Sequence, residues 1–200
     1  MAWDTERTMA LLLAAATKEF SDKGRAGARM DRIAQAAGVN KERIYKYFGK
    51  KDDLFNAVLV AQLEHAFEEL AIEGSGVKAL GEYAGRLFDR CSSDGTLARL
   101  LLWEGLESGS LSALSMTCEK HYSRTLTSLQ KVLPWISSED AAKLLLTVVT
   151  LCNAWTVLPQ PGVPSHSDRS SGVQDRRALL VHTALILAES LQQPSMAAPK

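Results

Sequence analysis

The chain has 200 residues, of which 46% are hydrophobic and 23% charged, and its 23 basic and 23 acidic side chains cancel. This is an ordinary globular balance, and the length allows one or two domains with a sizeable core. The apolar run at residues 9–16 is too short to cross a bilayer, and acidic residues precede it where a signal peptide would be basic. Three widely spaced cysteines give no disulfide framework, so we expect a cytoplasmic protein with no membrane partner.

The zero net charge hides an uneven distribution along the chain. Residues 1–55 hold eleven Lys and Arg against eight Asp and Glu, whereas the remainder holds twelve against fifteen. Within residues 23–51 the count is nine basic residues against two acidic ones. Taken alone, such a segment is either an ordinary solvated face or a surface that meets a polyanion.

Nearly every segment has the apolar spacing of a helix, and we find no convincing strand, internal repeat or sustained heptad. The first helix is expected to begin at a cap on Asp4 or Thr5 and to end at Gly24. The EGSGV segment at residues 73–77 predicts a linker, and the Pro-, Ser- and Gly-rich residues 159–172 predict a loop. The remaining helices are expected at residues 30–37, 41–48, 52–72, 78–92, 95–106, 110–133, 138–158 and 174–192.

Residues 30–48 have the apolar skeleton of a helix-turn-helix. Gly38 lies between two short helices and tolerates the positive φ that a tight turn requires. Ala34 is small enough to let the second helix cross closely, and branched residues on both sides can fix the steep crossing angle. The residues expected to form and brace this motif are Ile33, Ala34, Gly38, Val39, Ile44, Tyr47 and Phe48.

The second of these helices carries residue types that suit a DNA groove. Asn40 is a good N-cap, and the free N–H groups at that end of the helix favour an anion. Its basic residues can neutralise phosphates, and the Tyr45 hydroxyl can bond a phosphate oxygen without carrying charge. Together these features favour DNA binding over a plain helical hairpin.

The segment from Phe20 to Leu54 resembles the DNA-binding domain of TetR-type (TetR/AcrR) transcriptional regulators. That family has an F-x-x-x-G helix end, an I-A-x-x-A-G-V turn, and then S-K-G-T-L-Y-x-Y-F and S-K-x-x-L. The resemblance covers about residues 8–56. The matching residues are Phe20, Gly24, Ile33, Ala34, Ala37, Gly38, Val39, Lys41, Tyr45, Tyr47, Phe48, Lys51 and Leu54.

This resemblance implies roles for individual residues. Tyr45 and Lys51 would contact phosphates, and residues 40–46 would face base edges. The chain departs from the family where Ala28 and Arg29 replace the usual Thr or Ser cap, and where Glu42-Arg43 replaces Gly-Thr. Arg43 could read a guanine, while Glu42 could accept from a cytosine amino group or pair with Lys46. The expected DNA-contacting set is Arg29, Asn40, Lys41, Glu42, Arg43, Tyr45, Lys46, Lys50 and Lys51.

The resemblance also implies an all-α fold of about nine helices. We expect a helix-turn-helix DNA-binding domain at residues 1–52, a connecting helix and linker at residues 53–77, and a ligand-binding and dimerisation domain at residues 78–200. A single recognition helix covers little DNA, so we expect a homodimer that reads an inverted repeat. The apolar helices at residues 138–158 and 174–192 are the expected dimer interface, although filling the core of one chain is the alternative.

In the family, the C-terminal half encloses a small-molecule pocket whose occupation alters DNA binding. We therefore expect a repressor that a small, largely apolar ligand releases from its operator. The candidate pocket residues are aromatic, sulfur-bearing or polar, and each could equally be core. They are Phe88, Trp103, Met116, Cys118, His121, Tyr122, Cys152, Asn153 and Trp155.

Other functions have weaker support in the sequence. The S-x-x-K match at residues 128–131 lacks its companion motifs, so no catalytic residue and no cofactor is expected. Cys118 and His121 could share a metal with Cys152, but no C-x-x-C or H-x-x-x-H supports this, so no metal is expected. The alternative function is a helical small-molecule binding protein, or a redox or metal sensor, with weak or altered DNA binding.

Overall fold

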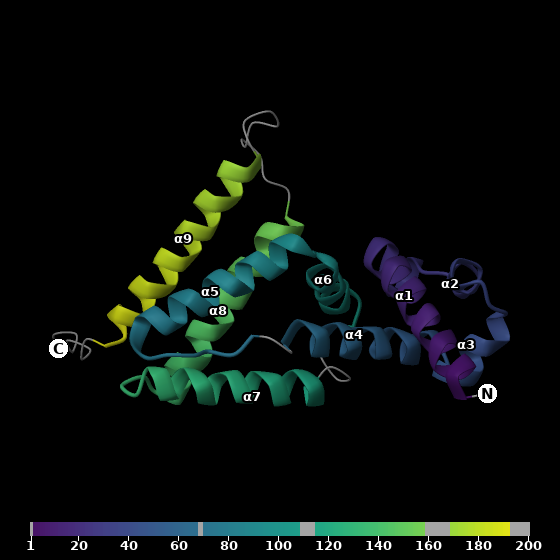
Figure 1. The fold of residues 1–200 in the computed structure, drawn as a ribbon, viewed down its shortest axis with the longest axis horizontal. Coiled ribbons are helices and arrows are strands. Elements are labelled where there is room, and N and C mark those ends of the chain that lie inside the picture. Colours follow the sequence, from purple (N-terminus) through teal and green to yellow (C-terminus); the bar gives the residue numbers. More distant parts are fainter. Residues whose placement is uncertain (1, 68–69, 109–114, 159–168, 193–200) are drawn as a thin grey trace. The chain divides into compact units, whose positions relative to one another are not determined.

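The computed structural model describes residues 2–67, 70–108, 115–158 and 169–192, with side chains at residues 5–66, 70–107, 119–158 and 172–192 (Figure 1). These residues form nine α-helices and, within the described ranges, no strand. The expected all-α class is therefore confirmed. The helices are α1 (Ala2–Gly27), α2 (Met30–Ala37), α3 (Lys41–Phe48), α4 (Lys51–Phe67), α5 (Gly76–Ser93), α6 (Thr96–Ser108), α7 (Ser115–Val132), α8 (Ser138–Val157) and α9 (Arg169–Ser190).

Several helix boundaries differ from the expected ones, and residues 110–114 of the helix expected at 110–133 lie outside the described residues. α1 already begins at Ala2, so neither Asp4 nor Thr5 marks its start. α4 ends at Phe67 rather than near residue 72. Leu70 and Ile72 are buried, but the chain there is not helical. α9 begins at Arg169, inside the segment expected to be a loop, and residues 159–168 of that loop lie outside the described part.

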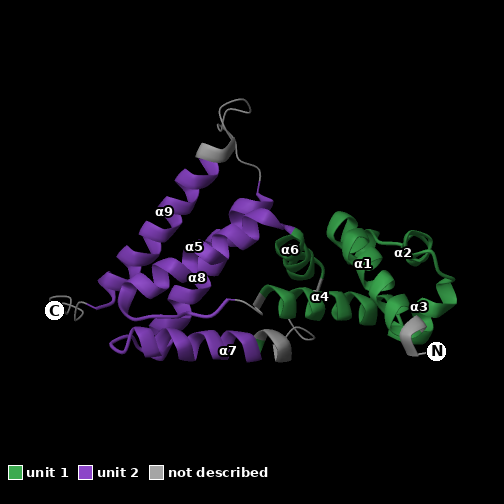
Figure 2. Cartoon of the chain, viewed as in Figure 1, with its two compact units in different colours: residues 1–66, 96–119 green, residues 67–95, 120–200 purple. Residues whose placement is uncertain are grey.

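The chain divides into two compact units (Figure 2). The N-terminal unit comprises residues 1–66 and 96–119, and the C-terminal unit comprises residues 67–95 and 120–200. This division differs from the boundaries expected from sequence, because α6 packs on α1 and so joins the first unit. Linker composition marks where the chain turns, but it does not reveal which neighbour the next helix packs against.

The core of the N-terminal unit collects apolar side chains from α1 to α4. Phe20 and Phe55 meet edge to face, with ring centroids 5.0 Å apart, and both are fully buried. Such an arrangement adds a specific aromatic contact to the burial of two large side chains. The other fully buried members are Leu12, Ala16, Ile33, Ile44, Leu54, Val58 and Leu59.

Near its C-terminal end, α1 breaks at Gly24, as the sequence predicts. Gly24 has φ 69° and ψ 176°, which interrupts the helix before its last turn. A Cβ at this position would lie 2.9 Å from the Trp103 ring and 2.5 Å from the Glu107 carboxylate, both on α6. Glycine is therefore required twice here, once by the backbone conformation and once by the close approach of α6.

The C-terminal unit is built around α5, which packs against α8 and α9, while α8 also packs against α9. Its buried core includes Leu80, Tyr83 and Phe88 from α5, and α7 contributes Leu129 and Val132. The Arg177 guanidinium of α9 donates to both oxygens of the Asp89 carboxylate of α5, at 2.8 and 2.9 Å. This partly exposed ion pair joins α9 to α5 at the surface of the unit.

Candidate nucleic-acid interface

The turn between α2 and α3 has the geometry that the sequence predicts. Gly38 caps α2 in the left-handed conformation, with φ 67° and ψ 30°. Its N–H donates to Gln35 O at 3.1 Å, and the Val39 N–H donates to Ala34 O at 3.0 Å. Ile33, Ala34 and Ile44 are buried, whereas Val39, Tyr47 and Phe48 are half-buried around them. The bracing set is therefore assembled as one helix-turn-helix.

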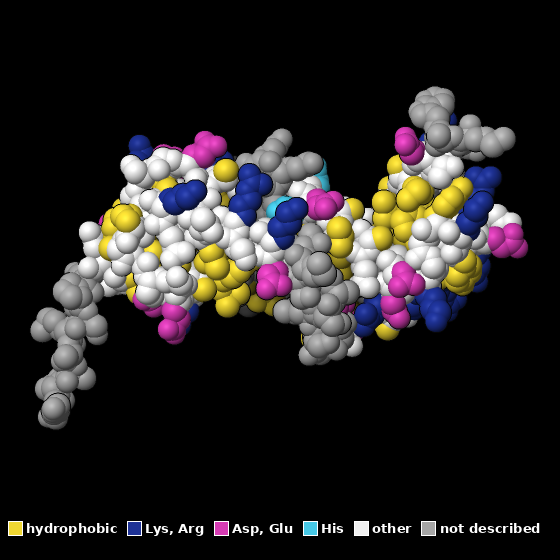
Figure 3. Space-filling model, turned by 90° about the horizontal axis from the view of Figure 1, so that it is seen from below, with side chains coloured by type: hydrophobic (Ala, Val, Ile, Leu, Met, Phe, Trp, Pro, Cys, Tyr) yellow, Lys and Arg dark blue, Asp and Glu magenta, His cyan; other side chains and the backbone are white. Residues whose placement is uncertain are grey.

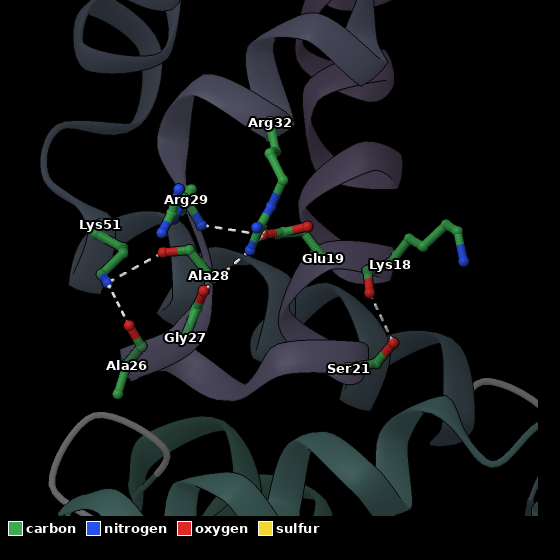
Figure 4. Close-up of polar contacts among 9 residues, drawn as sticks. All are labelled: Lys18, Glu19, Ser21, Ala26, Gly27, Ala28, Arg29, Arg32 and Lys51. Atoms are coloured by element: carbon green, nitrogen blue, oxygen red, sulfur yellow. Dashed lines mark hydrogen bonds and ion pairs between the residues drawn. The ribbon is translucent and has the colours of Figure 1, made fainter.

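The N-terminus of α2 is held by a residue that the sequence analysis missed. Arg29 occupies the N-cap position in an extended conformation and makes no side-chain cap, as the loss of the usual Thr predicts. Instead, Glu19 of α1 accepts the Arg29 N–H at 3.0 Å and the Arg32 Nε at 2.7 Å (Figure 4). A carboxylate from another helix thus takes the place of the missing hydroxyl.

The acidity of Glu19 reflects these contacts. Burial alone would raise its pKa, but the hydrogen bonds from the Arg32 side chain and the Arg29 backbone outweigh it. With the nearby charges of Arg32 and Lys23, they hold the pKa of Glu19 below its ordinary value. The carboxylate therefore stays ionised at neutral pH while it orients α2.

α3 has one fully buried side chain that packs into the core and several exposed side chains. Ile44 is fully buried, while Tyr45, the next residue, is 48% exposed. Asn40 caps the helix as predicted, because its side-chain oxygen accepts the Glu42 N–H at 3.2 Å. Arg43 and Lys46 are exposed on the same helix. A rigid helix thus presents one phenol and two positive charges to whatever it meets.

Three of the predicted DNA-contacting side chains on α3 have partners within the protein. Lys41 forms an ion pair with Asp31 of α2 at 2.8 Å, and that hydrogen bond raises the pKa of Lys41. Arg43 Nη1 lies 3.5 Å from Thr8 Oγ1 of α1, at the outer limit of a hydrogen bond. The Glu42 carboxylate accepts from the Asn40 side-chain amide at 3.2 Å. The contacts of Lys41 and Glu42 are exposed and that of Arg43 is long, so a ligand can displace them.

Lys51, predicted to contact a phosphate, also has a structural task. Its ammonium donates to Ala26 O and Ala28 O, both at 3.3 Å, and thereby ties the first turn of α4 to the end of α1 (Figure 4). An ammonium has three donors, so one N–H is left over from these two contacts. Lys50, its neighbour, is exposed. The two lysines therefore differ in their surroundings, because Lys51 bonds to two backbone carbonyls and Lys50 is exposed, although both were predicted to contact DNA.

Positive charge gathers on the N-terminal unit. Figure 3 shows Lys and Arg side chains along one edge of the N-terminal unit, with a few acidic side chains among them. Exposed Arg29, Arg43, Lys46 and Lys50 all come from residues 29–50, which include α2 and α3. A surface of this kind attracts a polyanion over a distance of about one Debye length.

The candidate pocket residues are not brought together as one set. Trp103 belongs to the N-terminal unit, where its Nε1 donates to Ser21 O at 3.3 Å. Phe88 and Trp155 meet edge to face at 5.9 Å in the C-terminal unit, and Cys152 is buried there. The side chains of Met116 and Cys118 lie outside the described residues.

The polar pocket candidates make local contacts in the C-terminal unit. Tyr122 donates its hydroxyl to Ala142 O at 2.9 Å, and Asn153 donates to Val149 O at 2.8 Å. His121 lines a cavity of about 100 Å³ together with Ile72 and Arg124. Because Tyr122 and Asn153 already bond to backbone carbonyls, neither hydroxyl nor amide needs a ligand to satisfy it.

Comparison with known proteins agrees with this arrangement. Residues 12–58 match the family profile described as "Bacterial regulatory proteins, tetR family", and residues 79–185 match "Tetracyclin repressor-like, C-terminal domain". The chain is 34% identical to the HTH-type transcriptional repressor SCO4008 of Streptomyces coelicolor over 164 residues, which cover 80% of this chain and 83% of that protein.

Two further relatives point the same way. The HTH-type transcriptional repressor NicS of Pseudomonas putida is 32% identical over 112 residues, covering 54% of this chain and 53% of that protein. The crystal structure of the regulator SCO4942 of Streptomyces coelicolor superposes with a TM-score of 0.72 at 28% identity, covering 94% and 99% of the two chains. The chain therefore belongs to the TetR family and is a DNA-binding transcriptional regulator.

Proposed function

We propose that this regulator is a repressor whose α3 enters the major groove of an inverted-repeat operator. The observation that carries the proposal is the contrast on α3, where Ile44 is fully buried and the adjacent Tyr45 is half exposed among basic side chains. Buried Ile44 fixes the helix, and Tyr45 can then reach a phosphate oxygen. Two curated relatives are named transcriptional repressors, which supports repression as the direction of control.

In this proposal, some charged side chains around α3 contact phosphates and one contacts a base. Lys46 and Lys50 neutralise phosphates, while Arg43 leaves Thr8 and offers its guanidinium to a guanine. Lys51 gives its remaining N–H to a phosphate and keeps its two backbone contacts. Lys41 leaves Asp31 and binds a phosphate, since an exposed ion pair contributes little to stability in water.

Dimerisation is expected through α8 and α9. Leu146 of α8 and Leu179 and Ile186 of α9 are 59%, 56% and 49% exposed. Leu179 and Ile186 are seven residues apart and therefore share one face of α9. A second copy of the chain would cover these side chains and place two α3 helices about 34–36 Å apart, one helical turn of DNA.

The C-terminal unit is the expected place for a regulatory ligand. Its match to the tetracyclin repressor-like C-terminal domain supports this, as does the aromatic pair of Phe88 and Trp155 in its interior. An inducer would act only if its affinity were higher for the arrangement of the protein that cannot bind DNA than for the arrangement that can.

The salt dependence of DNA affinity tests the proposed contacts. Lys50→Ala should lower the slope of log affinity against log salt by about one for a random-sequence duplex, because one phosphate contact is lost. Lys120→Ala, an exposed lysine of α7, is the matched control and should leave the slope unchanged. Equal slopes for the native protein and Lys50→Ala would exclude Lys50 from the interface.

Repression itself is measured in a purified transcription reaction. Adding the protein should reduce transcripts from a promoter that overlaps its binding repeat, because the bound dimer blocks polymerase. A rise in transcripts would show an activator instead.

A further inference from the structure

Two of the cysteines, distant in sequence, meet inside the C-terminal unit. Cys91 lies in the last turn of α5 and is half-buried, while Cys152 lies in α8 and is 1% exposed. Both thiols are free, and each shifts the pKa of the other. The Cys118 side chain, a candidate ligand beside His121 and Cys152 in the alternative metal site, lies outside the described residues. Among the described residues, no group of three or more His, Cys, Asp and Glu could hold a metal.

The backbones carrying the two thiols are fastened together at the same place. The Thr156 hydroxyl lies 3.2 Å from Cys91 O on α5 and 3.1 Å from Cys152 O on α8. The chain just after α5 also passes close to this residue, since a Cβ on Gly95 would lie 2.6 Å from the Thr156 methyl group. The two cysteines are therefore held in position by contacts that do not involve their sulfur atoms.

A third polar group lies close by in the otherwise apolar core. Tyr83 is fully buried, and within the described part of the chain its hydroxyl has no hydrogen-bond partner. Burial raises the pKa of Tyr83, and the neighbouring Cys152 and Cys91 raise it further. The phenol therefore stays neutral and lies near enough to both thiols to sense their charge.

The two thiols are unequal in acidity. The hydrogen bond from Cys152 lowers the pKa of Cys91, against the opposing effect of burial and with help from the charge of Arg90. The same hydrogen bond, burial and the charge of Cys91 raise the pKa of Cys152. Cys91 is also the more accessible of the two. It is therefore the sulfur that an oxidant reaches first, and its lowered pKa favours the thiolate.

We propose that Cys91 and Cys152 are an oxidation site at which hydroperoxides convert the thiol pair into an intrachain disulfide. The Cys91 thiolate attacks one peroxide oxygen, so that an S–O bond forms, the O–O bond breaks and hydroxide leaves. Cys152 then attacks the Cys91 sulfur, the S–S bond forms, and the S–O bond breaks as water leaves. In total two thiols and hydrogen peroxide give one disulfide and two waters, with two electrons passing to the peroxide.

The cross-link would join α5 to α8 next to the connection into α6. Cys91 is two residues from the end of α5 at Ser93, and α6 begins at Thr96. The inference goes beyond DNA recognition, because none of its residues belongs to the helix-turn-helix. Its test therefore uses chemistry and mass rather than DNA binding.

The experiment uses the full-length protein with Cys118→Ser, so that only the proposed pair can react. After treatment of the reduced protein with hydrogen peroxide, intact mass should fall by about 2 Da, the loss of two hydrogens. A non-reducing peptide map should contain one cross-linked species that joins the Cys91 and Cys152 peptides. An unchanged mass, a disulfide between two chains, or a gain of oxygen without a cross-link would overturn the proposal.

Single substitutions in the same background separate the two roles. Cys152→Ser should stop at the sulfenic acid of Cys91, a gain of about 16 Da that dimedone traps, because no second thiol can displace water. Cys91→Ser should leave the buried Cys152 unmodified at the same peroxide concentration. The reverse pattern, with Cys152 oxidised first, would contradict the assignment of Cys91 as the attacking sulfur.

Discussion

Arg25 shows how much one charged residue can hold together in the N-terminal unit. Its guanidinium lies 3.7 Å from the carboxylates of both Glu104 and Glu107 on α6, and 3.6 Å from Asp52 at the start of α4. It also lies over the Phe55 ring, 5.6 Å from the centroid. Glu104 is only 4% exposed, and its Oε2 has no hydrogen-bond partner among the described residues. Arg25 is thus the charge that compensates a buried carboxylate.

Removing Arg25 should therefore be costly. Arg25→Met should lower the free energy of unfolding by about 3 kcal/mol in denaturant titration, because a buried carboxylate loses its counter-charge. Adding Glu104→Gln should recover much of that loss. Lys18→Met, which breaks the exposed Lys18–Asp22 pair elsewhere on α1, is the control and should cost less than about 0.5 kcal/mol. Equal costs for Arg25→Met and Lys18→Met would show that the buried charge does not matter.

At the scale of helices, the kink of α1 at Gly24 lets α6 dock on it. Beyond the kink, the Ala26 N–H donates to the Glu107 carboxylate at 3.0 Å, and Arg99 Nε donates to Ser21 O at 3.0 Å. These are bonds from α6 to backbone groups that the break in α1 leaves free. The end of α1 is therefore capped by another helix rather than by its own sequence.

Gly24→Ala should disrupt this docking. The positive φ and the contacts with Trp103 and Glu107 together should cost about 2 kcal/mol or more in the free energy of unfolding. Gly105→Ala is the matched control within α6, since a Cβ there meets nothing within 4 Å. It should raise the free energy of unfolding by about 0.5–1 kcal/mol, because alanine favours a helix. A Gly24→Ala protein as stable as the native one would refute the steric account.

For the molecule as a whole, α8 is the most informative helix. It is long and apolar enough, by length and composition, to cross a bilayer. One of its faces fills the core with Ala141, Leu144, Leu145, Val148 and Cys152. The exposed Leu146 lies outside that face. In the proposed dimer, the core covers one side of α8 and a second copy of the chain covers the other, which accounts for this composition.

Dimerisation through α9 is tested by placing charges on its exposed stripe. Leu179→Glu with Ile186→Glu should halve the mass in light scattering, because two desolvated carboxylates would face their own symmetry copies. Lys78→Glu, on the exposed face of α5, should leave the dimer intact. A double variant that remains dimeric would place the interface elsewhere.

Local features of the fold follow from sequence, and long-range ones do not. The turn at Gly38, the break at Gly24 and the cap at Asn40 were predictable, because each depends on residues within one turn of helix. Residue spacing carries no record of a partner far along the chain. For that reason the Glu19 cap on α2, the Arg25 contacts with α6 and the pairing of Cys91 with Cys152 were all missed.

The sequence predicted which side chains of α3 are exposed, but not the partners that some residues of the candidate site have within the protein. The motif identified the exposed residues of α3, since an exposed Tyr45 beside a buried Ile44 follows from helical periodicity. It did not reveal that Lys51 also clamps Ala26 and Ala28, or that Lys41 is paired with Asp31. Such partners depend on how α1, α2 and α4 meet in space.

The central claim, that α3 of a dimer reads DNA, is tested most directly by selection of duplexes. The purified protein should enrich fragments with an inverted repeat from a random pool, and raising the salt concentration should weaken their binding. Tyr45→Ala should abolish the enrichment while its helical circular dichroism is unchanged, because Tyr45 is exposed and does not support the fold. Enrichment that persists in Tyr45→Ala, or no enrichment by the native protein at either salt concentration, would contradict the account.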